Sequence, residues 1–88
     1  MAYLYILYSE VLLKYYVGST HGTIEERLRR HLSDHHGFTG KSKDWKVVYF
    51  EYYEEFALAY KREHEIKAWK SKVRIKKLIL NQNDRVNS

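Results

Sequence analysis

The chain has 88 residues, of which 44% are hydrophobic and none is cysteine. This length predicts one domain with one modest core, and the lack of cysteine excludes disulfides and thiolate metal sites. No apolar run reaches membrane-spanning length and no signal pattern opens the chain, so we expect a soluble, cytoplasmic protein without a membrane partner.

The first half of the chain predicts a hairpin followed by a helix. Residues 3–8 alternate and are rich in Tyr, Leu and Ile, which predicts a strand, and a short connection leads to a second strand at residues 15–19. Thr23 followed by Glu26 is a capping box that begins the helix, and Gly37 is expected to end it. The apolar stripe of this helix is Ile24, Leu28 and Leu32.

The second half predicts one more strand and two helices. After a polar loop at residues 38–44, residues 45–53 alternate as a third strand. A helix is expected at residues 54–69, with Glu54 and Glu55 in its first turn, where the helix dipole favours acids. A shorter helix follows at residues 72–80, and residues 81–88 form a polar tail beyond a domain of residues 1–80. The alternation of the third strand predicts that one of its faces contains Val47, Tyr49, Glu51 and Tyr53. The last helix is predicted to bury Ile75, Leu78 and Ile79.

Several side chains around the first helix have the chemistry of a phosphate site. Arg27 and His31 are four residues apart, so they lie one turn apart on one helical face. Tyr16 lies two residues before Gly18 on the strand that leads into this helix. The glycine either lets the backbone leave the strand or admits a ligand that approaches closely, and both readings stay open at this point.

Glu63 interrupts an apolar face of the second helix, which is formed by Phe56, Ala59, Tyr60 and Ile66. An unpaired carboxylate is costly to bury. Three explanations remain: a salt bridge, a metal ion, or the edge of a cleft.

The positive charge of the chain is concentrated near its C-terminal end. The net charge is +5, and half of the 16 lysines and arginines lie between Lys61 and Lys77. A basic stripe of this kind is typical of nucleic-acid-binding proteins, although a solvated helix face is equally consistent with it. The residues that we expect to contact nucleic acid are Lys67, Lys70, Arg74 and Lys77.

Taken together, these motifs resemble the GIY-YIG nuclease family, particularly its small single-domain members and the N-terminal nuclease domain of the excision-repair nuclease subunit. The two signature triplets correspond to residues 3–5 and 16–18, with Tyr3 in place of the first glycine. Arg27, His31 and Glu63 match the helix arginine, a histidine that many members carry, and the metal-binding glutamate of the family.

The resemblance implies an α/β (α+β) fold, a three-stranded antiparallel sheet flanked by about three helices. It implies hydrolysis of DNA phosphodiester bonds with one divalent cation, Mg²⁺ or Mn²⁺. In that scheme Glu63 holds the metal and Arg27 clamps the phosphate, while Tyr16 takes the proton from the attacking water. Tyr5 orients water or phosphate, and His31 assists a tyrosine or contacts the phosphate.

Other readings stay open from the sequence. The domain is either an active endonuclease or a nucleic-acid-binding module that is inactive or acts only with a partner. The structure or sequence of the DNA, and whether a homodimer or a partner protein is involved, are not determined. His31 and His35 have the spacing of a zinc pair, but no cysteine and no convincing fourth ligand support a zinc site.

Overall fold

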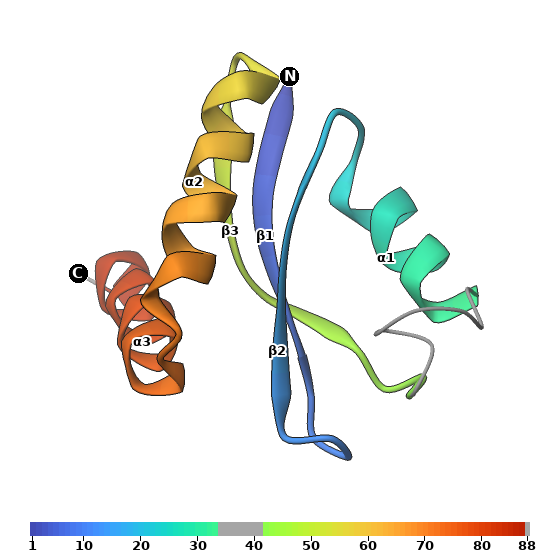
Figure 1. Ribbon diagram of the computed structural model, residues 1–88, viewed down its shortest axis with the longest axis vertical. Coiled ribbons are helices and arrows are strands. Elements are labelled where there is room, and N and C mark those ends of the chain that lie inside the picture. The colour runs from blue at the N-terminus through green and yellow to red at the C-terminus, as the bar shows by residue number, and fades with distance from the viewer. Residues whose placement is uncertain (34–41, 88) are drawn as a thin grey trace.

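The computed structural model describes residues 1–33 and 42–87, and it contains a three-stranded antiparallel sheet with helices on both faces. The sheet has the strand order β2-β1-β3, with α1 on one face and α2 and α3 on the other (Figure 1). The predicted α+β fold is therefore confirmed. In chain order the elements are β1 (Ala2–Ser9), β2 (Lys14–Thr20), α1 (Ile24–Ser33), β3 (Lys46–Tyr53), α2 (Phe56–Trp69) and α3 (Lys72–Asn87).

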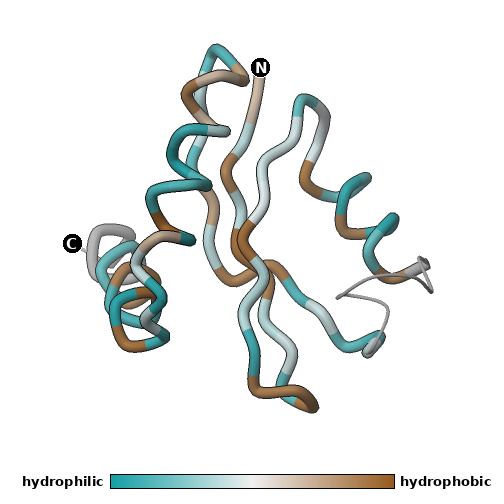
Figure 2. Tube along the Cα trace, in the orientation of Figure 1, coloured by the Kyte–Doolittle hydropathy of each residue, from teal (hydrophilic) through white to brown (hydrophobic). Residues whose placement is uncertain are grey.

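The central strand β1 is buried on both faces and separates two hydrophobic clusters. On the side of α2 and α3, Leu4 and Ile6 pack with Ile66 of α2. On the side of α1, Tyr5 and Leu7 pack with Trp45 and with the predicted stripe of α1, which is Ile24, Leu28 and Leu32. Figure 2 shows the hydrophobic residues gathered where the strands cross the middle of the molecule, and again at the tip of the β1–β2 hairpin.

The predicted alternation of β3 is wrong at its start because a bulge interrupts the ladder. Ile6 pairs with Tyr49 but Leu7 pairs with Val47, so Val48 is the extra residue. The bulge turns Val47 toward the α1 side, whereas Val48 and Tyr49 both pack on the side of α2 and α3. Each face of β1 thus obtains an apolar partner from β3.

The ends of the helices differ from the predicted ones in two places. Helix α2 begins at Phe56, so Glu54 and Glu55 precede it instead of lying in its first turn. Helix α3 ends at Asn87, seven residues beyond the predicted end at Leu80. Residues 81–87 contain no glycine or proline, so nothing in them stops the helix, and Gln82 Nε2 donates to the carbonyl of Phe50 at 3.2 Å.

The first helix begins as predicted, since the backbone N–H of Glu26 donates to Thr23 Oγ1 at 3.2 Å. The described residues do not include the predicted helix end at Gly37, most of the loop at residues 38–44, or His35.

Among residues 1–33 and 42–87, no helix is long and apolar enough to cross a membrane.

Candidate active site

Three of the predicted site residues are joined by hydrogen bonds on the α1 face of the sheet. The hydroxyl of Tyr5, on β1, lies 2.9 Å from His31 Nε2, on α1. Arg27 Nε, one helical turn before His31, donates to the same hydroxyl at 3.3 Å. Tyr5 is only 1% exposed, so its hydroxyl is shielded from solvent and forms the buried side of the candidate site.

The burial of Tyr5 fixes the protonation state of its phenol. Burial raises the pKa of Tyr5 to about 12, although the bond from Arg27 opposes this. The same hydrogen bond raises the pKa of Arg27, which stays a cation. At neutral pH the Tyr5 hydroxyl accepts from Arg27 and keeps its own proton, which it can donate to Nε2 of His31.

Tyr16 joins this group from the edge strand β2. Its ring lies edge-on against the His31 ring at 4.7 Å and beside the Tyr5 ring at 6.5 Å between centroids. It is half-buried, and Lys67 Nζ lies 6.0 Å from the centroid of its ring. The fold therefore brings Tyr5, Tyr16, Arg27 and His31 together, as the sequence predicted.

Gly18 is required by the Tyr5 side chain. In the β1–β2 ladder Gly18 is opposite Tyr5. A Cβ at Gly18 would lie 2.6 Å from the Tyr5 hydroxyl oxygen and 3.1 Å from a ring carbon of Tyr16. The sequence offered two readings of this glycine, a strand exit and the approach of a ligand, and the structure gives a third reason, the close approach of the Tyr5 phenol.

Glu63 lies at the β2 edge on the opposite face of the sheet from these phenols. Its side chain is 12% exposed, and it accepts hydrogen bonds from Ser19 Oγ on one oxygen and from Lys67 Nζ on the other. The salt bridge considered from the sequence is therefore present. The predicted apolar face around Glu63 is only partly correct, because Ala59 and Ile66 are buried but Tyr60 is 49% exposed.

The donors around Glu63 suit a hard divalent cation. The Glu63 carboxylate and the Ser19 hydroxyl are oxygen donors, which Mg²⁺ and Mn²⁺ prefer. In the part of the chain that the structure describes, no three His, Cys, Asp or Glu side chains form a metal-binding group. A cation at Glu63 would accordingly take most of its ligands from water and from a phosphate, as Mg²⁺ commonly does.

A hollow of about 360 Å³ lies beside the site, between the end of β2 and the start of α1. It contains Arg27 and Arg30, with Phe56 of α2 at its border. The sequence did not single out Arg30, because an exposed arginine next to Arg29 gives no local signal of a pocket. Its full lining is Ser19, Thr20, His21, Gly22, Thr23, Glu26, Arg27, Arg30 and Phe56.

The four residues of the predicted basic stripe are not brought together at the site. Lys67 lies beside Glu63 and Tyr16, and Lys70 ends α2 in the left-handed conformation with φ 49°. The Arg74 guanidinium lies 4.4 Å from the centre of the Trp69 ring system. Lys77 is exposed on α3, a helix that lies on the face of the sheet away from α1.

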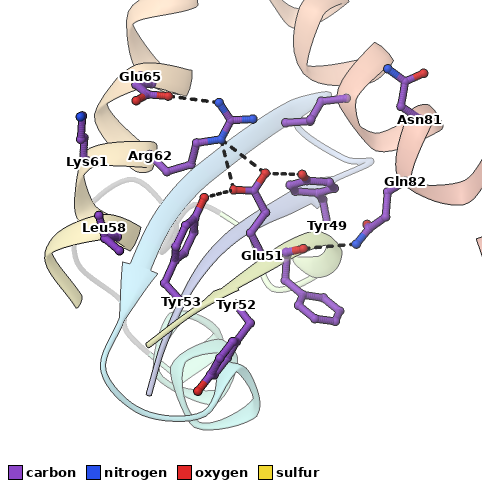
Figure 3. A pocket seen from close by; sticks show the side chains of 12 residues that line it. Tyr49, Glu51, Tyr52, Tyr53, Leu58, Lys61, Arg62, Glu65, Asn81 and Gln82 are labelled. Atoms are coloured by element: carbon purple, nitrogen blue, oxygen red, sulfur yellow. Dashed lines mark hydrogen bonds and ion pairs between the residues drawn. The ribbon is translucent and has the colours of Figure 1, made fainter. Parts of the chain in front are cut away.

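A larger hollow of about 660 Å³ lies between β3, α2 and α3, and the sequence did not predict it (Figure 3). Glu51 accepts hydrogen bonds there from the hydroxyls of Tyr49 and Tyr53 and from Arg62 Nε at 3.1 Å. Arg62 also pairs with Glu65 at 3.2 Å. Burial and the bonds to Glu51 raise the pKa of Tyr53 to about 12 and that of Tyr49 further. Every charged group of this network is thus bonded within it.

A family model described as the GIY-YIG catalytic domain matches residues 1–78. The match includes both triplets, the first helix, Glu63 and Lys67. The curated proteins and the solved structures compared with this chain gave no match.

Proposed function

The chain belongs to the GIY-YIG catalytic-domain family, a nuclease-type fold, and we propose that it is a divalent-metal-dependent endonuclease that hydrolyses phosphodiester bonds in DNA. The observation that carries this proposal is the hydrogen-bonded group of Tyr5, Arg27 and His31. These residues place a cation, a phenol and an imidazole side by side between β1 and α1, and the Tyr16 ring contacts the His31 ring. Phosphodiester hydrolysis needs these functions together: a positive clamp, a proton acceptor and fixed donors.

Arg27 has the geometry of a phosphate clamp. Its Nε is fixed by the Tyr5 hydroxyl, while the guanidinium borders the hollow that also contains Arg30. The partner of Nε is a neutral phenol, so this bond does not cancel the charge of Arg27. Its remaining N–H groups can therefore bind the oxygens of a phosphate.

Tyr16 is proposed as the base that accepts a proton from the attacking water. In the reaction the water oxygen bonds to phosphorus, one P–O ester bond breaks, and the departing oxygen takes up a proton. A phenol accepts a proton as its phenolate, and the Lys67 ammonium lies 6.0 Å from the centre of the Tyr16 ring. Tyr5, whose hydroxyl is bonded to both Arg27 and His31, is proposed for the other role, that of a fixed donor.

Glu63, with Ser19, would hold the divalent cation at the β2 edge. When bound, such an ion neutralises phosphate charge and stabilises the leaving oxygen. The protein's own contribution is to orient the carboxylate, through its bonds from Ser19 and Lys67.

The test is cleavage of labelled DNA of several structures by the purified protein, with and without Mg²⁺ or Mn²⁺, together with the Glu63→Gln variant. We expect cleavage only with metal, and a loss of about 10²–10³-fold or more in Glu63→Gln, because metal ions supply several kcal/mol of charge stabilisation. Glu65→Gln is the matched control on the same helix, since Glu65 pairs with Arg62 whereas Ser19 is bonded to Glu63. DNA binding should persist in both variants.

A second candidate function is a nucleic-acid-binding module without catalysis. It is favoured by one observation, the pairing of Glu63 with Lys67, which satisfies this carboxylate without a metal. This reading expects no cleavage under any metal condition, and a lower melting temperature in Glu63→Gln. Parental cleavage by Glu63→Gln would likewise leave Glu63 as a structural ion-pair partner.

A further inference from the structure

Four aromatic side chains form a continuous row along the outer surface of α2. The His21 ring, just after β2, stacks on the Phe56 ring with 3.8 Å between centroids and 17° between planes. Phe56 is followed by Tyr60 at 5.8 Å and Tyr60 by His64 at 4.4 Å. The last three rings are four residues apart, so they follow one face of the helix. We call this row the aromatic strip.

The strip is exposed although its rings are large. Tyr60 is 49% exposed, His21 and His64 are exposed, and only Phe56 is half-buried. Helix α2 is held to the sheet by another face, through the fully buried Ala59 and Ile66. The strip therefore contributes little to the core, and the contacts between its rings fix them in place before a ligand arrives.

The position and charge of the strip connect it to the candidate active site. Its first two rings border the hollow that contains Arg27 and Arg30. Farther along, it shares its helical face with Glu63 and Lys67. The charged side chains that line the hollow are Arg27, Arg30 and Glu26, so the hollow itself carries an excess of positive charge. Glu63 is paired with Lys67, and the exposed Glu54 and Glu55 precede Phe56 at the start of α2.

We propose that the aromatic strip binds unpaired nucleobases of a DNA strand whose phosphate lies at Arg27. Exposed aromatic rings beside a cationic groove are the means by which proteins bind single strands, since every base can stack on a ring and every phosphate is attracted by the cations. In a duplex the bases are stacked on one another and do not reach such rings. This inference rests on the proposed function and narrows its substrate class to DNA with a single-stranded segment next to the cleaved bond.

The test compares the affinity for two probes in EDTA, a labelled oligothymidine and a blunt duplex of the same length. The variants are Tyr60→Ala, Tyr60→Phe and the control Tyr52→Ala, which removes a ring that is 54% exposed on β3. We expect Tyr60→Ala to weaken oligothymidine binding by about 5- to 150-fold, the range of one base–aromatic stack, and duplex binding by less than about twofold. Tyr60→Phe keeps the ring and should bind like the parent, as should Tyr52→Ala.

Unchanged oligothymidine binding in Tyr60→Ala would overturn the proposal. An equal loss on oligothymidine and duplex would overturn it too, because stacking on unpaired bases is lost only from the single strand. A second readout uses an oligothymidine with one 2-aminopurine, whose fluorescence should fall on binding to the parent and less on binding to Tyr60→Ala. None of these measurements depends on cleavage. A negative result would therefore disprove base binding by the aromatic strip without bearing on the proposed nuclease activity.

Discussion

Two tyrosine–arginine networks lie on opposite faces of the sheet, and they differ in whether the arginine is paired with a carboxylate. In the first, Arg62 is bonded to Glu51 and Glu65, and Glu51 is bonded to two phenols. In the second, Arg27 is bonded to the neutral phenol of Tyr5, which is bonded in turn to His31. The residue types are nearly the same in both, and the presence of a carboxylate inside the network is the difference.

This difference separates a structural network from a reactive one. Glu51 accepts hydrogen bonds from both tyrosines and from Arg62, so this network connects β3 to α2. The positive charge of Arg62 is already paired with Glu51 and Glu65 and is not available to a ligand. In the Tyr5 network the charge of Arg27 is kept, and the carboxylate, Glu63, lies on the other side of the edge strand. A phosphate is the natural partner for such a cation.

The largest expected effect is that of removing the Tyr16 hydroxyl. Tyr16→Phe should lower single-turnover cleavage at saturating metal by about 10²–10⁴-fold, the usual contribution of a general base, with DNA affinity nearly unchanged. Tyr5→Phe should cost less, because Tyr5 only orients its neighbours. A Tyr16→Phe enzyme within a few-fold of the parent would contradict the assignment.

Tyr53→Phe is the matched control in the structural network. It removes one hydrogen bond to Glu51, so it should leave cleavage unchanged and lower the free energy of unfolding by about 1 kcal/mol. Thermal or urea unfolding measures the second quantity. A loss of cleavage in Tyr53→Phe at constant stability would mean that the two networks are not distinct.

Gly18→Ala should reduce cleavage by about 100-fold, the scale expected when a catalytic group is displaced by about 1 Å. The new methyl group would meet the buried Tyr5 phenol at 2.6 Å, so the phenol must move and its bonds to Arg27 and His31 must lengthen. The same overpacking should destabilise the fold by about 1–3 kcal/mol. Wild-type cleavage by a fully folded Gly18→Ala protein would show that the Tyr5 network is not needed for turnover.

Glu51→Gln should affect stability and its dependence on pH, with cleavage unaffected. Burial by itself raises the pKa of Glu51, but the bonds from Tyr49, Tyr53 and Arg62 outweigh it and hold that pKa below its ordinary value of 4.5. The ionised form therefore stabilises the fold above about pH 4.5, and this stabilisation is lost as the pH falls below that value.

We expect Glu51→Gln to unfold about 8–16 °C below the parent at neutral pH, from a loss of about 2 kcal/mol. Below about pH 4.5 the difference between the two proteins should shrink. Melting curves from pH 7 to pH 3 measure this convergence, and a constant difference would contradict the role of the Glu51 charge. Glu65→Gln, which removes the more exposed partner of Arg62, should change the melting temperature less.

The smallest expected effect is on the salt dependence of DNA binding. Neutralising Lys70, Arg74 and Lys77 together should lower the log–log slope of affinity against salt by about 0.9 for each lost phosphate contact on duplex. Lys46, which pairs with Glu10, is the control cation. An unchanged slope in the triple variant would mean that these three cations face solvent and that the DNA path lies elsewhere.

The sequence predicted most of the elements, and the proximity of the side chains proposed for the site, because both depend on local patterns. Alternation indicated the strands, the capping box indicated the start of α1, and the i, i+4 pair of Arg27 and His31 indicated a shared face. The bulge at Val48 was not predictable, since it arises from the packing of β3 against both faces of β1. The polar composition of residues 81–87 predicts fraying, whereas α3 continues through them to Asn87.

The Glu51 network was missed for a different reason. Tyr49, Glu51 and Tyr53 are ordinary alternating residues of a strand, and Arg62 is one of many cations in the basic stripe. Only the packing of α2 on β3 brings Arg62 to Glu51. Similarly, the charge pair of Glu63 and Lys67 was visible as an i, i+4 spacing, but its contact with Ser19 required the tertiary fold.

The strand order also determines when each half of the site is assembled during refolding. Strand β1 meets β2 through a turn of a few residues, because Ser9 is opposite Lys14, but it meets β3 only by joining Tyr8 to Lys46. Closing a short loop costs less entropy than closing a long one, so we expect the hairpin to pair before β3 joins it. Tyr5 and Gly18 meet in that hairpin, whereas Glu63 lies on α2 and reaches Ser19 only through tertiary packing. We therefore expect a refolding chain to bring its phenols together before it places its carboxylate.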